Sequence, residues 1–195
     1  MISVITGTMA SSKSKTLIDY TEFLKDKNKK YKIFVPACCQ KKDGCVISRN
    51  DNREVKAIKI FNINDLYNNL DNCDVLIIDE VQFLVSTSEI DEFMLFLEYI
   101  DKKNIDLYMF GLNLDYLSNS FNLTERILPY ADTIITLTAI CDECGKPACR
   151  CLRYVDNELD INPNSETLLM ESEKVIYKSV CRDCYRKLTG LNAIK

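Results

Sequence analysis

The sequence predicts an α/β fold: a doubly wound parallel sheet followed by a small cysteine-rich domain at the C-terminus. Up to about residue 138, short β-rich runs alternate with helical periodicity, which is typical of a parallel sheet covered by helices. The run from Asp74 to Asp79 (DVLIID) is continuously apolar and ends in acid, as expected of a central strand buried on both faces. From Ile140 the apolar periodicity fades and cysteines become frequent. We therefore expect one domain at residues 1–138 and a second at 139–195.

The individual elements follow from the same patterns. Strands are expected at residues 2–6, 31–35, 55–60, 74–79, 106–110 and 133–137, and helices at 13–27, 64–70, 89–102 and 124–128. A last short helix is expected to begin near Cys181. Between the two cysteine-rich stretches, residues 156–174 are polar and acidic with little core-forming content, which predicts a loop.

The composition excludes several classes of function. No run of 18 uncharged apolar residues occurs and no basic leader precedes an apolar stretch, so we expect a cytoplasmic protein without a membrane span. The net charge of −4 without a basic patch argues against a nucleic-acid partner. The chain has ten cysteines and no histidine, so a zinc site would need cysteine or carboxylate ligands, and a general base cannot be histidine.

Residues 7–14 (GTMASSKS) lie between a predicted strand and a predicted helix and match most of the phosphate-loop pattern G-x-x-x-x-G-K-[ST]. In such a P-loop, main-chain N–H groups cradle phosphate, the lysine reaches the β and γ phosphates, and the hydroxyl holds Mg²⁺. The predicted phosphate-binding residues are Gly7, Thr8, Met9, Ala10, Ser11, Ser12, Lys13 and Ser14.

Ser12 stands where the P-loop pattern has glycine. If this position requires a positive φ, serine costs about 1 kcal/mol there. The octet alone is equally compatible with a strand-turn-helix that has a serine-rich N-cap and a solvated lysine.

The end of the DVLIID run supplies the second part of a phosphate site. Asp79 is placed to support Mg²⁺ opposite the loop hydroxyl, and Glu80 to accept a proton from a nucleophile. The alternative is that both residues only cap the next element. Because the acidic pair follows Gly7, Lys13 and Ser14 by about 65 residues, we favour the functional interpretation.

Two cysteine pairs, Cys141-x-x-Cys144 and Cys181-x-x-Cys184, have the spacing of a tetrahedral Cys₄ zinc site. Four thiolates leave no open coordination position, so we expect a structural role. Two cysteines between the pairs, Cys149 and Cys151, are alternative ligands. Four others lack ligand spacing and are expected to be mostly ordinary buried thiols: Cys38, Cys39, Cys45 and Cys73.

Five segments in this order resemble the zinc-containing thymidine kinase family over nearly the whole chain. They are the P-loop with Met9, residues 79–83 (DEVQF, similar to D-E-[AG]-Q-F), 111–121 (GLNLDYLSNSF), 137–145 (LTAICDECG) and 177–185 (YKSVCRDCY). The resemblance implies ATP-dependent phosphorylation of the 5′-hydroxyl of thymidine or deoxyuridine for nucleotide salvage and DNA synthesis. It also implies Mg²⁺, structural zinc, and a homotetramer or homodimer.

The resemblance also assigns roles to residues. Glu80 would take the proton of the 5′-hydroxyl, and Asp79 and Gln82 would join the phosphate site. The loop between the cysteine pairs would be the family's lasso, which closes over the base. The implied nucleoside-binding residues are Met9, Phe83, Tyr116, Phe121, Leu168, Leu169, Met170 and Tyr177. From sequence alone, Phe83, Tyr116 and Phe121 are equally compatible with plain core aromatics.

Some positions depart from the family pattern, among them Ser12, Asn113 in place of aspartate, and Cys39 and Lys41 where the family has aspartate and arginine. Two alternatives to a kinase therefore remain. One is a catalytically impaired nucleotide-binding or regulatory homologue, which the loop changes favour and an intact Glu80 opposes. The other is a zinc-stapled P-loop ATPase, which would release phosphate without a nucleoside.

Overall fold

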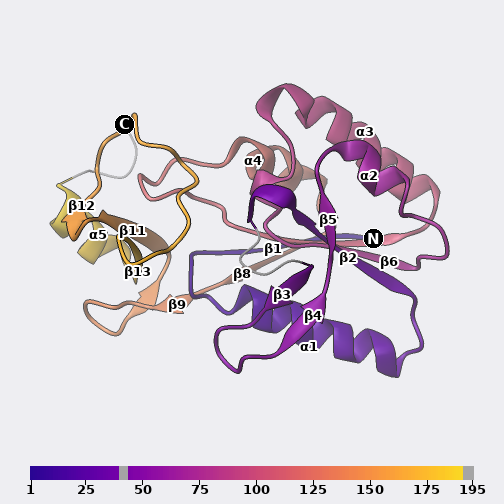
Figure 1. Ribbon diagram of the computed structural model, residues 1–195, viewed down its shortest axis with the longest axis horizontal. Coiled ribbons are helices and arrows are strands. Elements are labelled where there is room, and N and C mark those ends of the chain that lie inside the picture. Colours follow the sequence, from indigo (N-terminus) through magenta and orange to yellow (C-terminus); the bar gives the residue numbers. More distant parts are fainter. Residues whose placement is uncertain (40–43, 191–195) are drawn as a thin grey trace.

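A six-stranded, fully parallel sheet forms the centre of the computed structural model, which describes residues 1–39 and 44–190 (Figure 1). Its strands in spatial order are β5 (Ile58–Ile60), β2 (Tyr31–Pro36), β6 (Val75–Ile78), β7 (Asp106–Gly111), β1 (Ile2–Gly7) and β8 (Thr133–Leu137). The predicted α/β fold is confirmed.

Helices cover both faces of the sheet (Figure 1). The α-helices of this part are α1 (Lys13–Asp26), α2 (Ile63–Tyr67), α3 (Ile90–Lys102) and α4 (Asn122–Ile127). Short 3₁₀ helices are η1 (Ala37–Cys39), η2 (Val81–Phe83), η3 (Thr87–Glu89) and η4 (Leu128–Tyr130). Helix α1 lies on one face, with α2, α3 and α4 on the other. This arrangement is doubly wound.

Strand β6 shows how one sequence serves both faces. Val75 and Ile77 belong to the apolar cluster that packs under α1, whereas Leu76 and Ile78 belong to the cluster under α3. All four side chains are essentially inaccessible to water. Because successive side chains of a strand point to opposite faces, a strand between two helical layers must be apolar throughout.

The segment expected as one strand at residues 55–60 is divided in two. Its first part, β4 (Glu54–Lys56), pairs antiparallel with β3 (Cys45–Ile47) in a separate hairpin, and only β5 joins the parallel sheet. The break lies at Ala57, whose N–H donates to the oxygen of Gly44 (2.8 Å). The hairpin packs Val46 into the cluster under α1, a long-range contact that local residue patterns do not reveal.

The C-terminal part, residues 139–190, contains short antiparallel strands that the sequence reading did not anticipate. They are β9 (Ala139–Ile140), β10 (Pro147–Ala148), β11 (Arg150–Val155), β12 (Glu158–Leu159) and β13 (Val175–Val180), followed by the expected helix α5 (Arg182–Thr189). The pairs β9–β10 and β11–β12 are local, whereas β11 and β13 pair across a long sequence separation. The strands surround a small core that includes Leu152, Val180 and Tyr185. Among the described residues, no helix is long and apolar enough to cross a membrane.

Candidate active site

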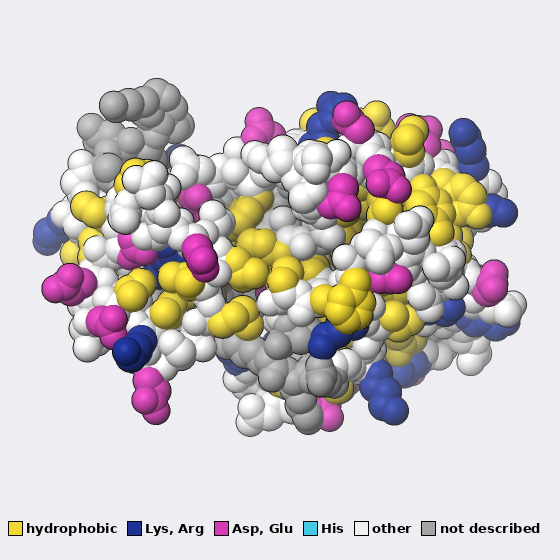
Figure 2. All heavy atoms as spheres, turned by 45° about the horizontal axis from the view of Figure 1, so that its top comes forward, with side chains coloured by type: hydrophobic (Ala, Val, Ile, Leu, Met, Phe, Trp, Pro, Cys, Tyr) yellow, Lys and Arg dark blue, Asp and Glu magenta, His cyan; other side chains and the backbone are white. Residues whose placement is uncertain are grey.

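A cavity of about 540 Å³ lies at the carboxyl ends of the central strands, against the C-terminal part. Figure 2 shows hydrophobic side chains gathered near the middle of the molecule, between its two lobes. Fifteen of the predicted site residues line the cavity: Met9, Ala10, Ser11, Ser12, Lys13, Ser14, Asp79, Glu80, Phe83, Tyr116, Phe121, Leu168, Leu169, Met170 and Tyr177. Gly7, Thr8 and Gln82 are not part of the lining but bond to lining residues, the first two to Lys13 and the third to Glu80.

The P-loop joins the last residue of β1, Gly7, to the first residue of α1, Lys13. The Lys13 ammonium is buried and donates to the main-chain oxygens of Gly7 (3.1 Å) and Thr8 (2.8 Å). Burial lowers the pKa of Lys13, while the negative charges of Glu80 and Asp79 oppose that shift. The cation therefore sits where a phosphate group would compete with main-chain oxygens for its protons.

Ser12 adopts the left-handed backbone conformation (φ 65°) that the P-loop pattern reserves for glycine. This conformation costs a residue with a Cβ atom about 1 kcal/mol or more. The main-chain oxygen of Ser12 accepts hydrogen bonds from the N–H (2.9 Å) and the hydroxyl (3.0 Å) of Thr16. The Ser12 hydroxyl accepts one from the Asn50 amide (3.3 Å). The loop thus keeps the geometry of a glycine at this position despite the substitution.

The two acidic residues directly follow β6. Burial, and then the neighbouring Glu80 carboxylate, raise the pKa of Asp79 to about 7, while Lys13 opposes the shift. Glu80 has a left-handed backbone (φ 51°), a conformation that costs a non-glycine residue about 1 kcal/mol or more. The Gln82 amide donates to the Glu80 carboxylate (2.7 Å) and accepts the N–H of Leu112 (2.9 Å). Gln82 therefore orients Glu80 from behind the cavity.

Aromatic rings line the other end of the cavity. Phe83 and Phe121 meet edge to face with their centroids 5.4 Å apart. The guanidinium carbon of Arg153 lies 3.5 Å from the centroid of the Tyr116 ring. All three aromatic residues line the cavity, which favours a pocket function over the plain-core alternative.

Residues 160–174, hereafter the lasso segment, pass over this aromatic end. Side chains from other elements hold the segment through its backbone oxygens and one carboxylate. The contacts are Tyr116 Oη to the oxygen of Asn162 (2.7 Å), Arg153 to the oxygen of Glu166 (2.5 Å), Tyr177 Oη to the oxygen of Leu169 (2.8 Å), and Arg49 to the carboxylate of Glu171 (2.5 Å). As a result, residues 167–171 form one wall of the cavity.

Arg153 is the centre of this attachment. Its side chain is fully buried (0% exposed) and pairs with the carboxylate of Asp160 through two nitrogens, at 3.0 and 2.7 Å. A buried guanidinium with a paired carboxylate and a stacked ring is held in one orientation. It can therefore fix both the start and the middle of the lasso segment.

Four cysteines of the C-terminal part meet in one cluster: the Sγ atoms of Cys141, Cys144, Cys181 and Cys184 all lie within 4.8 Å of one another. Cys144 and Cys181 are 3.7 Å apart. Tetrahedral zinc with Zn–S bonds of about 2.3 Å needs sulfur atoms roughly 3.8 Å apart, so the cluster fits zinc.

Cys149 and Cys151, the alternative ligands that the sequence offered, are not part of the cluster found among the described residues. Cys151 is instead buried on β11 and lines the cavity, and burial raises its pKa to about 12. The expectation of buried thiols at Cys38, Cys39, Cys45 and Cys73 is wrong, because Cys38 is exposed and the other three are half-buried.

Comparison with known proteins decides the family. A family model described as thymidine kinase matches residues 1–185. The chain belongs to the thymidine kinase family. The family is one of kinases, so the predictions of the family and of an enzyme are confirmed.

Individual relatives agree. A thymidine kinase of Thermococcus kodakarensis is 30% identical over 195 residues, which cover 93% of this chain and 92% of the relative. That of Pseudothermotoga lettingae is 27% identical over 195 residues, covering 98% and 97%. That of Mycoplasmoides gallisepticum is 30% identical over 183 residues, covering 93% and 79%.

Several residues of the site were not singled out from the sequence. Arg49 and Asn50 come from the loop after β3, and Asp160 anchors the lasso segment together with Arg153, which the sequence showed only as a residue retained from the family pattern. No short motif marks Arg49 and Asn50, because their partners, Glu171 and Ser12, lie far away in sequence. Lys41, which stands where the family has arginine, lies outside the described residues.

Proposed function

We propose that the protein transfers the γ-phosphoryl group of ATP to the 5′-hydroxyl of thymidine or deoxyuridine. The product is a nucleoside monophosphate for nucleotide salvage and DNA synthesis. One observation carries this proposal: Lys13, Asp79 and Glu80 line the same cavity as an aromatic pocket under the lasso segment. A phosphate donor and a flat apolar base can therefore be held at opposite ends of one space.

The step that this arrangement supports is an in-line phosphoryl transfer. The 5′-oxygen forms a bond to the γ-phosphorus, the bond from that phosphorus to the bridging oxygen breaks, and ADP leaves with the bond's electron pair. The 5′-hydroxyl proton passes to the Glu80 carboxylate, which the Gln82 amide orients through its 2.7 Å hydrogen bond. Lys13 neutralises part of the negative charge on the phosphate groups.

The donor set also fits Mg²⁺. A hydroxyl and a carboxylate, from Ser14 and Asp79, both line the cavity, and hard oxygen ligands of this kind suit the ion. Burial and the Glu80 charge raise the pKa of Asp79 to about 7, so a nearby cation would favour its ionised form. When bound, Mg²⁺ would neutralise charge on the β and γ phosphates.

For the nucleoside, we propose recognition by the aromatic rings and by the lasso backbone. Phe83 and Phe121 offer apolar faces for a base, and Leu168 to Met170 offer main-chain N–H and C=O groups within the cavity wall. Because Tyr177 already binds the oxygen of Leu169, the base would use the neighbouring main-chain groups. Zinc at the cysteine cluster would stabilise the C-terminal part that carries this segment.

A catalytically impaired nucleotide-binding homologue is the second candidate, favoured by the serine that stands in place of glycine in the P-loop, at a position with a positive φ. The deciding experiment is turnover of a nucleoside panel by the zinc-loaded protein with ATP and Mg²⁺. Glu80→Gln is the test variant, and Glu98→Gln, on the exposed side of α3, is the matched control.

We expect turnover of thymidine or deoxyuridine that falls about 10²- to 10⁴-fold in Glu80→Gln and is unchanged in Glu98→Gln. ATP binding without turnover of any nucleoside would establish the second candidate. Phosphate release that needs no nucleoside would indicate an ATPase.

We further propose a homodimer or homotetramer, in line with the family resemblance. Strand β8 is at the edge of the sheet and exposes Ile134 (52%) and Ile135 (46%), which is unusual for an edge that faces only water. Light scattering after size exclusion tests the oligomer. A monomer at micromolar concentration would contradict it.

A further inference from the structure

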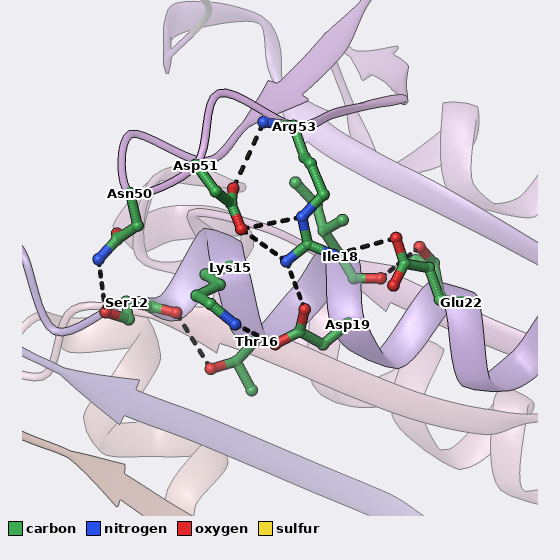
Figure 3. Close-up of polar contacts among 10 residues, drawn as sticks. Ser12, Lys15, Thr16, Ile18, Asp19, Glu22, Asn50, Asp51 and Arg53 are labelled. Carbon is green, nitrogen blue, oxygen red and sulfur yellow. Dashed lines mark hydrogen bonds and ion pairs between the residues drawn. The ribbon is translucent and has the colours of Figure 1, made fainter.

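The loop between β3 and β4, residues 48–53, reaches over the start of α1 and meets the P-loop (Figure 3). At its tip, the Asn50 amide donates to the Ser12 hydroxyl (3.3 Å). At its base, the N–H of Ser48 donates to the oxygen of Arg53 (2.9 Å), and the N–H of Asn52 donates to the oxygen of Ser48 (2.9 Å). The loop is therefore a closed turn with a fixed contact to the phosphate site.

Arg53 fastens this loop to α1, as Figure 3 shows. Its guanidinium pairs with Asp51 of its own loop (2.7 Å) and with Asp19 (2.5 Å) and Glu22 (3.0 Å) of the helix. Lys15 joins the same cluster through Asp19 (2.8 Å). A single exposed ion pair contributes little stability, but several ion pairs that share one guanidinium restrict where the loop can lie.

Arg49 is carried by this loop and lines the same cavity as Lys13. Among the described residues that line it, the cations are Lys13, Lys15 and Arg49. Burial is the main cause of the lowered pKa of Lys13, and the positive charge of Arg49 lowers it further. The Arg49 guanidinium therefore lies within electrostatic reach of the P-loop lysine.

The partner of Arg49 in this structure belongs to the opposite wall. Its guanidinium pairs with the carboxylate of Glu171 (2.5 Å), the residue that follows Leu168, Leu169 and Met170 on the lasso segment. The Arg49 side chain is 60% exposed, whereas that of Glu171 is 24% exposed. The pair thus bridges the wall that would hold the nucleoside and the loop that covers the phosphate site.

We propose that Arg49 is a further substrate-contacting residue, which binds the phosphate groups of the nucleoside triphosphate. Glu171 is its positioning residue and orients the guanidinium when the lasso segment lies over the nucleoside. This inference rests on the proposed function, which supplies the triphosphate. A guanidinium suits the role because its planar fork of N–H groups matches phosphate oxygens, while one carboxylate leaves part of that fork free.

The first test compares Arg49→Gln and Arg49→Lys with the parent. Binding of a non-hydrolysable ATP analogue with Mg²⁺ is measured by calorimetry, and KM and kcat are measured with the accepted nucleoside. We expect Arg49→Gln to weaken analogue binding about 10- to 100-fold, because it loses charged hydrogen bonds. Arg49→Lys should lose less, because it keeps the charge without the fork. Arg126→Gln, an exposed arginine on α4, should change nothing.

The second test addresses the positioning role of Glu171. Glu171→Gln should lower turnover more than it weakens analogue binding by the nucleoside-free protein. Combined with Arg49→Gln, its effect on kcat/KM for ATP should be much less than additive, because both act through the same guanidinium. A merely structural contact would lower the free energy of unfolding of Glu171→Gln, measured with urea, and would weaken analogue binding as much as turnover.

The outcomes separate this inference from the function on which it rests. The inference is overturned, and the proposed function left intact, by the following pair of results. The parent turns over thymidine, and Arg49→Gln binds the analogue and has a KM for ATP like the parent. If the parent turns over no nucleoside, the calorimetric comparison still decides whether Arg49 contacts phosphate. Equal analogue affinities of parent and Arg49→Gln then overturn the inference as well.

Discussion

The two ends of the cavity are built in different ways. The phosphate end consists of short contiguous segments, residues 7–14 and 79–80, which directly follow the buried strands β1 and β6. The nucleoside end depends on the lasso segment, which has no regular secondary structure over most of its length. Side chains from β3–β4, β11, β13 and the loop after β7 hold it in place.

This difference indicates how each end of the cavity should respond to substitutions. The phosphate end takes its geometry from the backbone of the sheet, so a local change there should act locally. The nucleoside end takes its geometry from a few buried contacts and from the fold of the C-terminal part. A change far from the substrate should therefore still alter nucleoside binding. The four predictions below test this contrast.

Removal of zinc should have the largest effect. Chelation from the zinc-loaded protein should unfold the C-terminal part, because metal binding and folding are coupled at such sites. Nucleoside turnover should be abolished, while circular dichroism retains the helices of the α/β part and ATP-analogue affinity falls only a few-fold.

Cys144→Ser should reproduce the effect of chelation, and Cys73→Ser, a cysteine outside the cluster, should not. Loss of ATP binding in parallel with loss of turnover would show that the two ends are not separable. The 2.6 Å hydrogen bond from Ser179 to the oxygen of Met9 is the contact through which that could happen.

Arg153→Met should come next. The substitution leaves the buried Asp160 carboxylate without its guanidinium and removes the ring contact with Tyr116. Losing one partner of a buried ion pair costs about 3–5 kcal/mol, which denaturant unfolding would measure. KM for the nucleoside should rise at least about 10-fold as the lasso segment loosens, with ATP-analogue affinity nearly unchanged.

In Arg153→Lys, the free energy of unfolding and the KM for the nucleoside should lie between those of Arg153→Met and the parent, because lysine keeps the charge but not the planar fork of N–H groups. An equal weakening of nucleoside and ATP binding would contradict the separation of the two ends.

Asp79→Asn should change the pH dependence of stability in the ligand-free protein. Burial first, and then the Glu80 charge, raise the pKa of Asp79 to about 7, above its unfolded value, so the folded state binds the extra proton between about pH 4 and pH 7. The parent should therefore lose stability as pH rises through this window.

The Asn variant should lack that loss and exceed the parent by about 1 kcal/mol or more at pH 8. Urea unfolding at a series of pH values measures it, with the exposed Asp101→Asn as control. A parent and an Asp79→Asn variant with parallel pH profiles would refute the assignment.

Ser12→Gly should have the smallest effect. Glycine removes the cost of a left-handed backbone at φ 65°, and its greater freedom in the unfolded chain offsets part of the gain. We expect a net stabilisation of about 0.5–1 kcal/mol in chemical denaturation. Ser12→Ala keeps the strain and loses only the Asn50 contact, so a stabilised alanine variant would show that the backbone is not the cause.

The phosphate end could be predicted from the sequence because its chemistry is local. Gly7, Lys13 and Ser14 have the fixed spacing of a strand-loop-helix phosphate site, and Asp79 and Glu80 directly follow the apolar run of residues 75–78. From the sequence, a positive φ at Ser12 was only a condition under which serine would be costly, and the backbone has it. Gln82 carried a signal in the DEVQF motif, but its position behind Glu80 did not follow from it.

The alternation of strands and helices, the P-loop octet, the acidic strand end and the two cysteine pairs were determined by the sequence itself. Each depends on residues a few positions apart, where periodicity and spacing act directly. Only the tertiary structure decided the β3–β4 hairpin, the antiparallel strands of the C-terminal part, and the places of Arg49 and Arg153. These depend on burial and on charge partners contributed by other elements of the fold, which outweigh local preference.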